Sequence, residues 1–316
     1  MISSSSGRSS ITADAGRSHI LAYHAYGLSI RSALELPELT RLDDNKAIDV
    51  EIAFSAVDGP LPGPDVARVV RIERNHAYLA WPRIGRFLVT RQGQVTIDPL
   101  TDQSLAIRFA ILGPVMAAYL QLNGIPLLHG SAVAIDGRAI LCIGRKTAGK
   151  STMAAALVAA GCTLLNDDVL PLRIGVVPAL TPGFPALKLS SSARALLLPD
   201  RPIIGDQSAD PADKLVVALP GAPTGDIAIG LVVLLDPDGL SGIATVSPVE
   251  ALGALLQEGY SLKFGDHALE AGQGSLLFDS CARIASQCRI VRAGRSHDLA
   301  GIPMVADQLR ALARSE

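Results

Sequence analysis

The chain has 316 residues, of which 49% are hydrophobic, 18% are charged and only 4% are aromatic. This length corresponds to about two domains and suffices for a buried core, and the apolar content excludes a wholly disordered chain. The 28 basic and 30 acidic residues leave a net charge of −2, which argues against nucleic acid as a partner.

The chain opens with a serine-rich segment, residues 1–18, which has no apolar periodicity, and we expect a disordered tail there. This segment lacks the apolar centre of a secretory signal, and no apolar stretch reaches the ~20 residues of a membrane span. The four cysteines form no C-x-x-C pair and no zinc-ligand spacing, so we interpret them as small buried hydrophobes. We therefore expect a cytoplasmic protein without a membrane partner.

Residues 19–100 alternate between short β-prone runs and turn residues. The runs LAYHAYGLSI, IDVEIAF, ARVVRIE, HAYLAW, RFLVT and QVTID predict strands, and Gly59-Pro60 and Gln92-Gly93 predict turns between them. We predict a small, mostly antiparallel, β-rich N-terminal domain over these residues.

The pattern changes to helical from about Asp102 to Leu122, where apolar residues recur every three or four positions and Pro114 should kink or split the helix. The runs LLHGSAVAI and RAILCI then predict two strands joined by a tight Asp136-Gly137 turn. A glycine-containing loop, a helix over about 150–160 and the short strand CTLLN follow. This order predicts an α/β fold (α+β for the whole chain), with the second domain spanning residues 101–316.

The rest of the chain continues the α/β rhythm. VLPLRI, KLVVAL and AIGLVVLL predict strands, whereas SPVEALGALLQEG, SLLFDSCARIASQ and PMVADQLRALARS predict helices. Between them, residues 178–211 are rich in Pro, Ser and Asp, and we expect functional loops there.

The strongest motif is the segment 144–151, GRKTAGKS, a full match to the phosphate-binding pattern G-x-x-x-x-G-K-[ST] between an apolar strand and an Ala-rich helix. Glycines let the backbone amides converge on phosphate oxygens, and the helix N-terminus adds its positive dipole end. Lys150 can then reach the β- and γ-phosphates and Ser151 can bind Mg²⁺. The predicted nucleotide-binding residues are Gly144, Arg145, Lys146, Thr147, Ala148, Gly149, Lys150, Ser151 and Thr152.

Acidic residues for a metal or a base have two candidate positions. Asp167-Asp168 follow the strand CTLLN, where adjacent carboxylates favour a nearby cation, although a solvated turn or a helix cap is the alternative. Asp236 ends an apolar run that imitates a Walker B strand, but its context also predicts a turn, and we favour the turn. His129 precedes the hairpin, where a lone histidine is most often structural.

Across nearly fifty residues, LLHGSAVAIDGRAILCIGRKTAGKSTMAAALVAAGCTLLNDDVLPL resembles the core of the HPr kinase/phosphorylase family. The resemblance implies a P-loop domain of the HPr kinase/PEP carboxykinase type, with Lys150 and Ser151 on phosphate and Mg²⁺. It implies that Asp167 is the base for the acceptor hydroxyl, Asp168 a metal or structural partner, and His129 a neighbour that hydrogen-bonds to Asp167. It also implies oligomers, although no interface is legible in the sequence.

Flanking motifs resemble a narrower branch of that family, the kinases encoded beside lasso-peptide genes, which phosphorylate the C-terminal serine of a precursor peptide. These motifs are Y-x-x-YGL-x-I at residues 23–30, LPEL at 36–39 and TPGFP at 181–185. A peptide acceptor needs a docking surface, for which the TPGFP loop and the N-terminal domain are candidates, with Phe184 and Lys188 near the acceptor. A solvated loop lysine is the alternative for Lys188.

Two departures from the family pattern stand out. Thr147-Ala148 replace the family's Ser-Gly in the loop, so Ala148 has to manage without glycine's freedom at positive φ. The downstream Arg/Gly-rich segment used for dephosphorylation has no counterpart, so we expect no phosphorylase activity and no action on HPr itself.

The sequence thus predicts a kinase that uses ATP and Mg²⁺ to phosphorylate a peptide serine, with a lasso precursor as the favoured acceptor. Two alternatives stay open. The first is a nucleotide-sensing module without phosphotransfer, against which the aspartate pair argues. The second is a kinase of a small hydroxylated metabolite, which a deep closed pocket beside Asp167 would favour.

Overall fold

The structure is a computed structural model that describes residues 21–43, 46–63, 66–207, 214–221, 223–237, 242–264, 274–294 and 299–315. The predicted disordered tail, residues 1–18, lies outside the described residues, as does the second half of the turn expected after Asp236.

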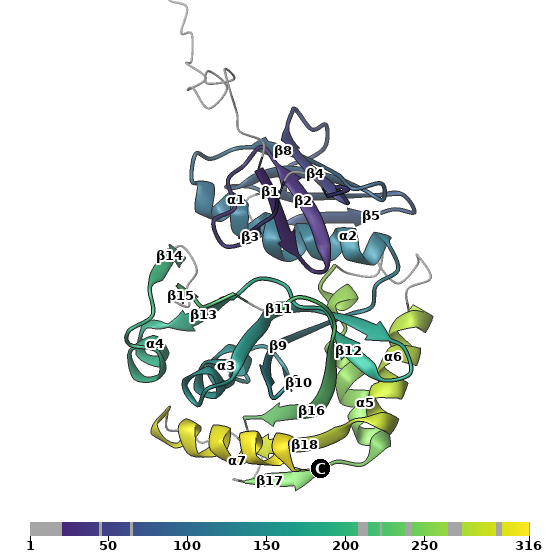
Figure 1. The fold of residues 1–316 in the computed structure, drawn as a ribbon. Coiled ribbons are helices and arrows are strands. Elements are labelled where there is room, and N and C mark those ends of the chain that lie inside the picture. The colour runs from purple at the N-terminus through teal and green to yellow at the C-terminus, as the bar shows by residue number, and fades with distance from the viewer. Residues whose placement is uncertain are drawn as a thin grey trace, which may run out of the picture.

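The N-terminal third forms one eight-stranded sheet (Figure 1). Neighbouring strands are antiparallel except that β4 runs parallel to both β2 and β8, so the mostly antiparallel prediction is confirmed. The run LAYHAYGLSI is two strands rather than one, because Tyr26 and Gly27 take φ values of 57° and 73° and form the hairpin turn. In sheet order the strands are β3 (Thr40–Arg41), β1 (Leu21–Ala25), β2 (Leu28–Ser32), β4 (Val50–Phe54), β8 (Gln94–Pro99), β7 (Gly85–Thr90), β6 (His76–Trp81) and β5 (Val69–Ile72).

The predicted long helix is present and changes its winding at the proline. It comprises α1 (Ser104–Ala110), a π-helical segment η1 (Ile111–Val115) that contains Pro114, and α2 (Met116–Leu122). Its apolar residues share one core with the first sheet, and it lies between this sheet and the rest of the molecule (Figure 1). The last strand of this sheet in chain order, β8, ends at Pro99, and the core continues past it into the helix.

This helix qualifies by length and composition as a candidate membrane span, which the sequence patterns did not suggest. Most of the window, 78%, is buried inside the structure. Burial between two layers accounts for its apolar character, as in the core helix of many proteins.

The second sheet has seven strands in the order β10-β9-β11-β12-β16-β18-β17, and β10 also pairs with β16. The predicted hairpin is confirmed, since β9 and β10 pair antiparallel across Asp136-Gly137, while β10, β16 and β18 run parallel. The strands are β9 (Leu127–Ile135), β10 (Arg138–Ile143), β11 (Thr163–Ile174), β12 (Pro178–Leu180), β16 (Ile227–Asp236), β17 (Ile243–Thr245) and β18 (Arg289–Gly294).

Helices cover both faces of the second sheet, which makes an α/β/α arrangement (Figure 1). Successive residues of β10 point to opposite faces of the sheet. Ile140 and Cys142 pack with α3 (Lys150–Ala159) and α7 (Ile302–Arg314) on one face. Leu141 packs with α5 (Pro248–Gln257) and α6 (Gly274–Gln287) on the other face. The mixed α/β fold predicted from the sequence is thereby confirmed.

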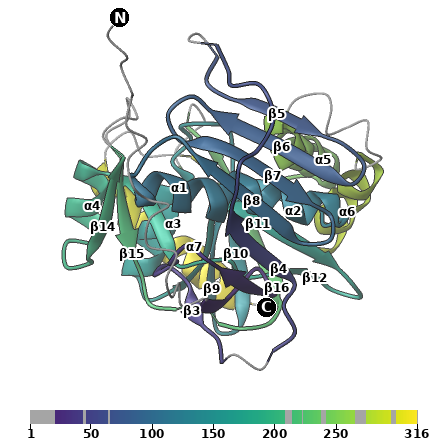
Figure 2. The same cartoon turned by 90° about the horizontal axis from the view of Figure 1, so that it is seen from above.

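Residues 178–211, expected as loops, are largely regular where they are described. They contain β12, β13 (Ala186–Ser190), the short helix α4 (Ser191–Leu197) and β14 (Ile203–Gln207). A third sheet, β13-β15-β14, is completed by β15 (Lys214–Ala218). Figure 2 shows this sheet and α4 on the opposite side of the molecule from α5 and α6. Among the described residues of this range, 181–185 and 198–202 belong to neither a helix nor a strand.

Candidate active site

The phosphate-binding segment leaves the end of β10 and enters α3 in the strand–loop–helix order that the motif requires. Gly144 has to be glycine, because a Cβ there would lie 2.7 Å from the carbonyl oxygen of Leu235. Gly149, at the N-cap of α3, takes φ 91°. The loop is thus pressed against the end of the parallel strand β16.

The non-glycine residue of the loop with a positive φ is Thr147, at 72°, and not Ala148. The expectation that Ala148 needs glycine's freedom was therefore wrong. Ala148 is buried, and its amide donates a hydrogen bond to the Arg145 carbonyl at 3.0 Å. A non-glycine residue in the left-handed region is strained, so this loop carries its strain at Thr147.

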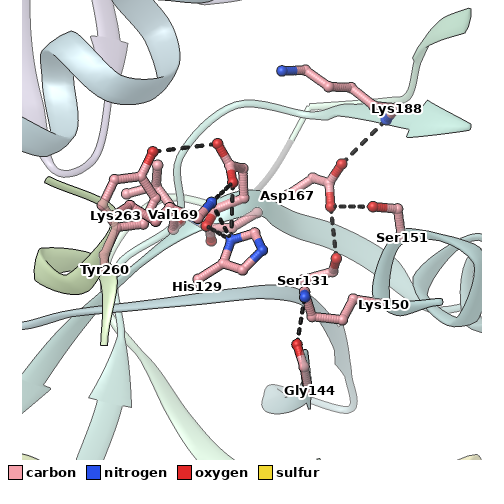
Figure 3. Close-up of polar contacts among 12 residues, drawn as sticks. His129, Ser131, Gly144, Lys150, Ser151, Asp167, Val169, Lys188, Tyr260 and Lys263 are labelled. Atoms are coloured by element: carbon pink, nitrogen blue, oxygen red, sulfur yellow. Dashed lines mark hydrogen bonds and ion pairs between the residues drawn. The ribbon is translucent and has the colours of Figure 1, made fainter. Parts of the chain in front are cut away.

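Lys150 is folded back over the loop. Its Nζ donates to the carbonyl oxygen of Gly144 at 2.5 Å (Figure 3). It also donates to the carbonyl oxygen of Arg145 at 3.1 Å. Burial lowers the pKa of Lys150, the nearby carboxylate of Glu258 opposes this effect, and the charge of Lys263 adds to it. A lysine held on carbonyls inside such a loop can turn to phosphate oxygens, which are stronger acceptors.

Asp167 meets the loop directly. Its Oδ1 accepts hydrogen bonds from the hydroxyls of Ser151 at 2.9 Å and Ser131 at 2.6 Å, and its Oδ2 accepts one from the amide of Lys188 at 3.1 Å (Figure 3). A carboxylate has about four acceptor positions. The three donors leave one position on Oδ2 for a further proton donor, which suits a base.

Both aspartates lie on one face of β11, although consecutive residues of a regular strand point to opposite faces. Asp168 takes φ 82°, and the register with β9 shifts just before the pair. Asp167 contacts Ser131 and Asp168 contacts His129, and these two residues, two positions apart on β9, share a face. The left-handed residue therefore brings the second carboxylate to the site. The pair also lies inside the twelve-residue strand β11 and does not end it, contrary to our expectation.

Asp168 sits in a compact polar cluster with His129, Lys263 and Tyr260. Its Oδ1 lies 2.6 Å from Lys263 Nζ and 2.9 Å from His129 Nδ1, and the Tyr260 hydroxyl donates to its Oδ2 at 3.3 Å. Lys263 and Tyr260 belong to the 3₁₀ turn η2 (Tyr260–Phe264), which no sequence motif marks. Their proximity to Asp168 is a product of the fold and could not be read from the sequence.

Burial and charge together shift the pKa values of this cluster. Burial opposes the ionisation of Asp168, but contact with His129 and the positive charge of Lys263 outweigh it, and the pKa of Asp168 lies well below its ordinary value. Burial lowers the pKa of Lys263 against the opposing effect of Asp168. Burial and the Asp168 charge raise the pKa of Tyr260 well above its ordinary value.

One contact implied by the family resemblance differs in the structure. His129 was expected to bond to Asp167, but its Nδ1 contacts the side chain of Asp168, and also the Asp168 carbonyl at 3.1 Å. Asp168 forms an ion pair with Lys263 at 2.6 Å, and the carboxylate beside the Ser151 hydroxyl is that of Asp167.

The two residues expected near the acceptor differ in their surroundings. Phe184 is buried, with its ring centroid 6.4 Å from that of Tyr26 and 6.3 Å from that of Phe109, so it belongs to the core and not to an open docking surface. Lys188 is adjacent to Asp167 through its backbone amide, and its Nζ lies 5.2 Å from the centre of the Phe109 ring. Lys188 therefore lies beside Asp167, whereas Phe184 packs in the interior.

Asp236 ends β16 and forms an ion pair with Arg292 at 3.3 Å. β16 runs beside β10 in parallel, so Asp236 lies near the start of the phosphate-binding loop. The carboxylate in hydrogen-bond contact with the loop serine is that of Asp167.

The chain matches no family model, and no curated protein matches it. Among solved structures it is similar to the HPr(Ser) kinase/phosphatase from Coxiella burnetii, with 12% sequence identity and a TM-score of 0.30. That match covers 58% of this chain and 88% of the other. A likeness of this strength does not assign the chain to a family.

Proposed function

We propose that this protein is a kinase that uses ATP and Mg²⁺ to phosphorylate a serine hydroxyl of a peptide, with a lasso precursor peptide as the substrate. The observation that carries the proposal is the 2.9 Å hydrogen bond from Ser151 to Asp167, which joins a phosphate-binding loop to a carboxylate. The residue pattern of the segment 127–172 supports the same reaction.

The residues present fit a nucleotide and its metal. Ser151 and Asp167 offer adjacent hard oxygen ligands of the kind that Mg²⁺ prefers. Gly144 lets the loop backbone lie directly against the end of β16, where a Cβ would collide with the Leu235 carbonyl. Lys150 already donates to a carbonyl inside the loop. Bound Mg²⁺ would neutralise charge on the phosphates of ATP.

In the proposed transfer, the oxygen of the acceptor serine attacks the γ-phosphorus of ATP and the bond to the bridging β–γ oxygen breaks, which releases ADP. Asp167 accepts the hydroxyl proton at the free position of Oδ2. Lys150 moves from the loop carbonyls to the phosphate oxygens. Lys188, next to Asp167, contacts the acceptor.

The two alternative functions are weaker. Three hydrogen bonds orient the Asp167 carboxylate, an arrangement that a nucleotide sensor without phosphotransfer does not need. A small-metabolite kinase would be favoured by a deep closed pocket at Asp167, whereas two cavities among the described residues are lined around Pro126 and around Gly183.

The test incubates the protein with [γ-³²P]ATP, Mg²⁺ and the precursor peptide encoded beside its gene, and identifies the labelled residue. We expect label on serine with the wild type, none with Lys150→Ala, and none on a peptide whose acceptor serine is alanine. Equal labelling by Lys150→Ala would refute the proposal. Tight ATP binding by calorimetry without transfer to the peptide would favour the sensor.

A further inference from the structure

We propose that Gly113, in the π-helical segment η1, determines specificity for the acceptor, because its missing side chain leaves the space in front of the aspartate pair that the acceptor residue enters. This role rests on the proposed function, since it places the acceptor of that reaction. Three features support it: the backbone at Gly113, the surroundings of its α-carbon, and the access of solvent to Asp168.

The backbone at position 113 does not require a glycine. The φ of Gly113 lies outside the left-handed region, so alanine could take the same conformation. Inside a helix, glycine is also less favourable than alanine. What the missing side chain provides is therefore space.

That space faces the aspartate pair. Apart from the backbone of the same helix, the one atom of the described residues within 4 Å of a Cβ built at Gly113 is Asp168 Oδ2, at 3.8 Å. Gly113 itself is buried, whereas the Asp168 side chain is 28% exposed. The position beside Gly113 is thus covered by the helix and open to solvent at Asp168.

The same helix also covers Lys188. Phe109 precedes Gly113 by about one helical turn, and Lys188 Nζ lies 5.2 Å from the centre of the Phe109 ring. The Lys188 amide in turn donates to Asp167 Oδ2, the oxygen that has a free acceptor position. Phe109 and Gly113 therefore bound the space on the acceptor's side of the base.

The segment η1 is anchored above this space. Pro114 has no amide proton, and the helix widens into π-winding around it. The carbonyl oxygen of Leu112 accepts a hydrogen bond from the buried Tyr26 hydroxyl at 2.7 Å. An anchored backbone resists displacement by an added methyl group, so a Cβ at Gly113 would take its room from the acceptor.

The nucleotide and the acceptor would reach Asp167 from different sides. In the view of Figure 3, Lys188 lies on one side of Asp167, and Gly144 and Lys150 lie on the other. In-line transfer needs the attacking oxygen and the leaving oxygen on opposite sides of the phosphorus. The space between Gly113 and Asp168 is the one that we assign to the acceptor.

The first experiment is NMR of the wild type. Labelling leucine carbonyls with ¹³C and glycine amides with ¹⁵N selects glycines that follow a leucine, and the chain has two of these, Gly113 and Gly253. Gly253, exposed on α5, is the internal control. With a non-hydrolysable ATP analogue and Mg²⁺ present, saturation with the precursor peptide should shift the Gly113 signal and leave the Gly253 signal unchanged. An unshifted Gly113 signal, with peptide binding established by calorimetry, overturns the proposal.

The second experiment compares Gly113→Ala with Gly253→Ala, whose Cβ would meet nothing within 4 Å. Both variants should resist urea at least as well as the wild type, because alanine favours a helix. Gly113→Ala should lower kcat/KM for the peptide about 10-fold or more, as one methyl group in a recognition site does, with the KM for ATP within about 2-fold. Gly253→Ala should keep both constants within about 2-fold of the wild type.

The outcomes separate this role from the proposed function. A folded Gly113→Ala protein with the wild-type kcat/KM for the peptide overturns the role of Gly113 and leaves the proposed function intact. If Gly113→Ala does not fold, the NMR titration of the wild type decides. A wild type that binds ATP but transfers nothing to the peptide would refute the proposed function, and this role with it.

Discussion

The Ser151 hydroxyl donates a hydrogen bond to Asp167 Oδ1 at 2.9 Å, although 16 residues separate them in the chain. This contact exists because α3 starts at the end of β10 and the chain returns along β11, on the far side of β9. It makes the phosphate-binding loop and the aspartate pair one site.

Asp167→Asn should abolish most of the transfer. An amide keeps the size of the side chain but cannot accept the acceptor's proton, and loss of a general base lowers rates by about 10²–10⁴-fold. Single-turnover transfer from ATP to the precursor peptide measures the effect. Asp307→Asn is the matched control, since Asp307 is exposed on α7 and pairs with Arg310, and it should react at nearly the wild-type rate. Near-normal turnover of Asp167→Asn would remove Asp167 from the role of base.

Thr147→Gly should stabilise the protein, because it relieves a left-handed non-glycine residue that costs roughly 1–2 kcal/mol, less the ~1 kcal/mol that glycine's flexibility costs. Ala148→Gly should destabilise it by about 0.5–1 kcal/mol, because Ala148 gains nothing from that freedom. Urea unfolding of the two variants compares them directly. If Ala148→Gly stabilised the protein and Thr147→Gly destabilised it, position 148 and not 147 would be the one that requires glycine.

Asp168 should make stability depend on acidity. Because its folded pKa lies below its unfolded value of about 3.9, the ionised carboxyl contributes stability above that pH, and this contribution is lost as the pH falls through the folded pKa. Asp168→Asn should therefore cost about 1–3 kcal/mol at pH 7 and progressively less below about pH 4. Urea unfolding between pH 7 and pH 3 follows the difference between the two proteins. If the difference in unfolding free energy between the wild type and Asp168→Asn did not change with pH, the ionised Asp168 carboxylate would not be the source of the lost stability.

Gly183 of the TPGFP loop should not tolerate a methyl group. A Cβ there would lie 2.6 Å from the Tyr26 ring and 2.8 Å from Asn166 Nδ2, both in the packed interior. Gly183→Ala should cost about 1–3 kcal/mol, as overpacking does. Gly221, whose Cβ would meet nothing within 4 Å, provides the comparison: Gly221→Ala should stay within about 0.5 kcal/mol. Equal effects in thermal unfolding would contradict the packing argument.

Much of this arrangement could be predicted from the sequence, because local signals agreed with the fold. The hairpin before the loop, the helix after it and the three C-terminal helices follow from periodicity and turn residues. For example, α5 starts at the capping pair Ser247 and Glu250, where the Ser247 hydroxyl accepts from the Glu250 amide at 3.3 Å.

What could not be predicted depends on contacts between distant segments. Ser131 appears in the sequence as a small residue in an apolar strand, yet its hydroxyl binds Asp167. Lys263 lies 95 residues from Asp168 and carries no motif. The left-handed conformation that turns Asp168 toward His129 leaves no mark in its residue type, so the sequence pattern led us to expect His129 on Asp167 instead.

The most direct test is a crystal structure with a non-hydrolysable ATP analogue and Mg²⁺. An acceptor hydroxyl needs about 3–3.5 Å to phosphorus and about 2.6–3.2 Å to its base, so Asp167 Oδ2 should lie roughly 4–6 Å from the γ-phosphorus. We predict this distance, with Lys150 on the phosphates and Ser151 on the metal. A nucleotide bound away from residues 144–151, or an Asp167 carboxylate turned away from the γ-phosphate, would contradict the account.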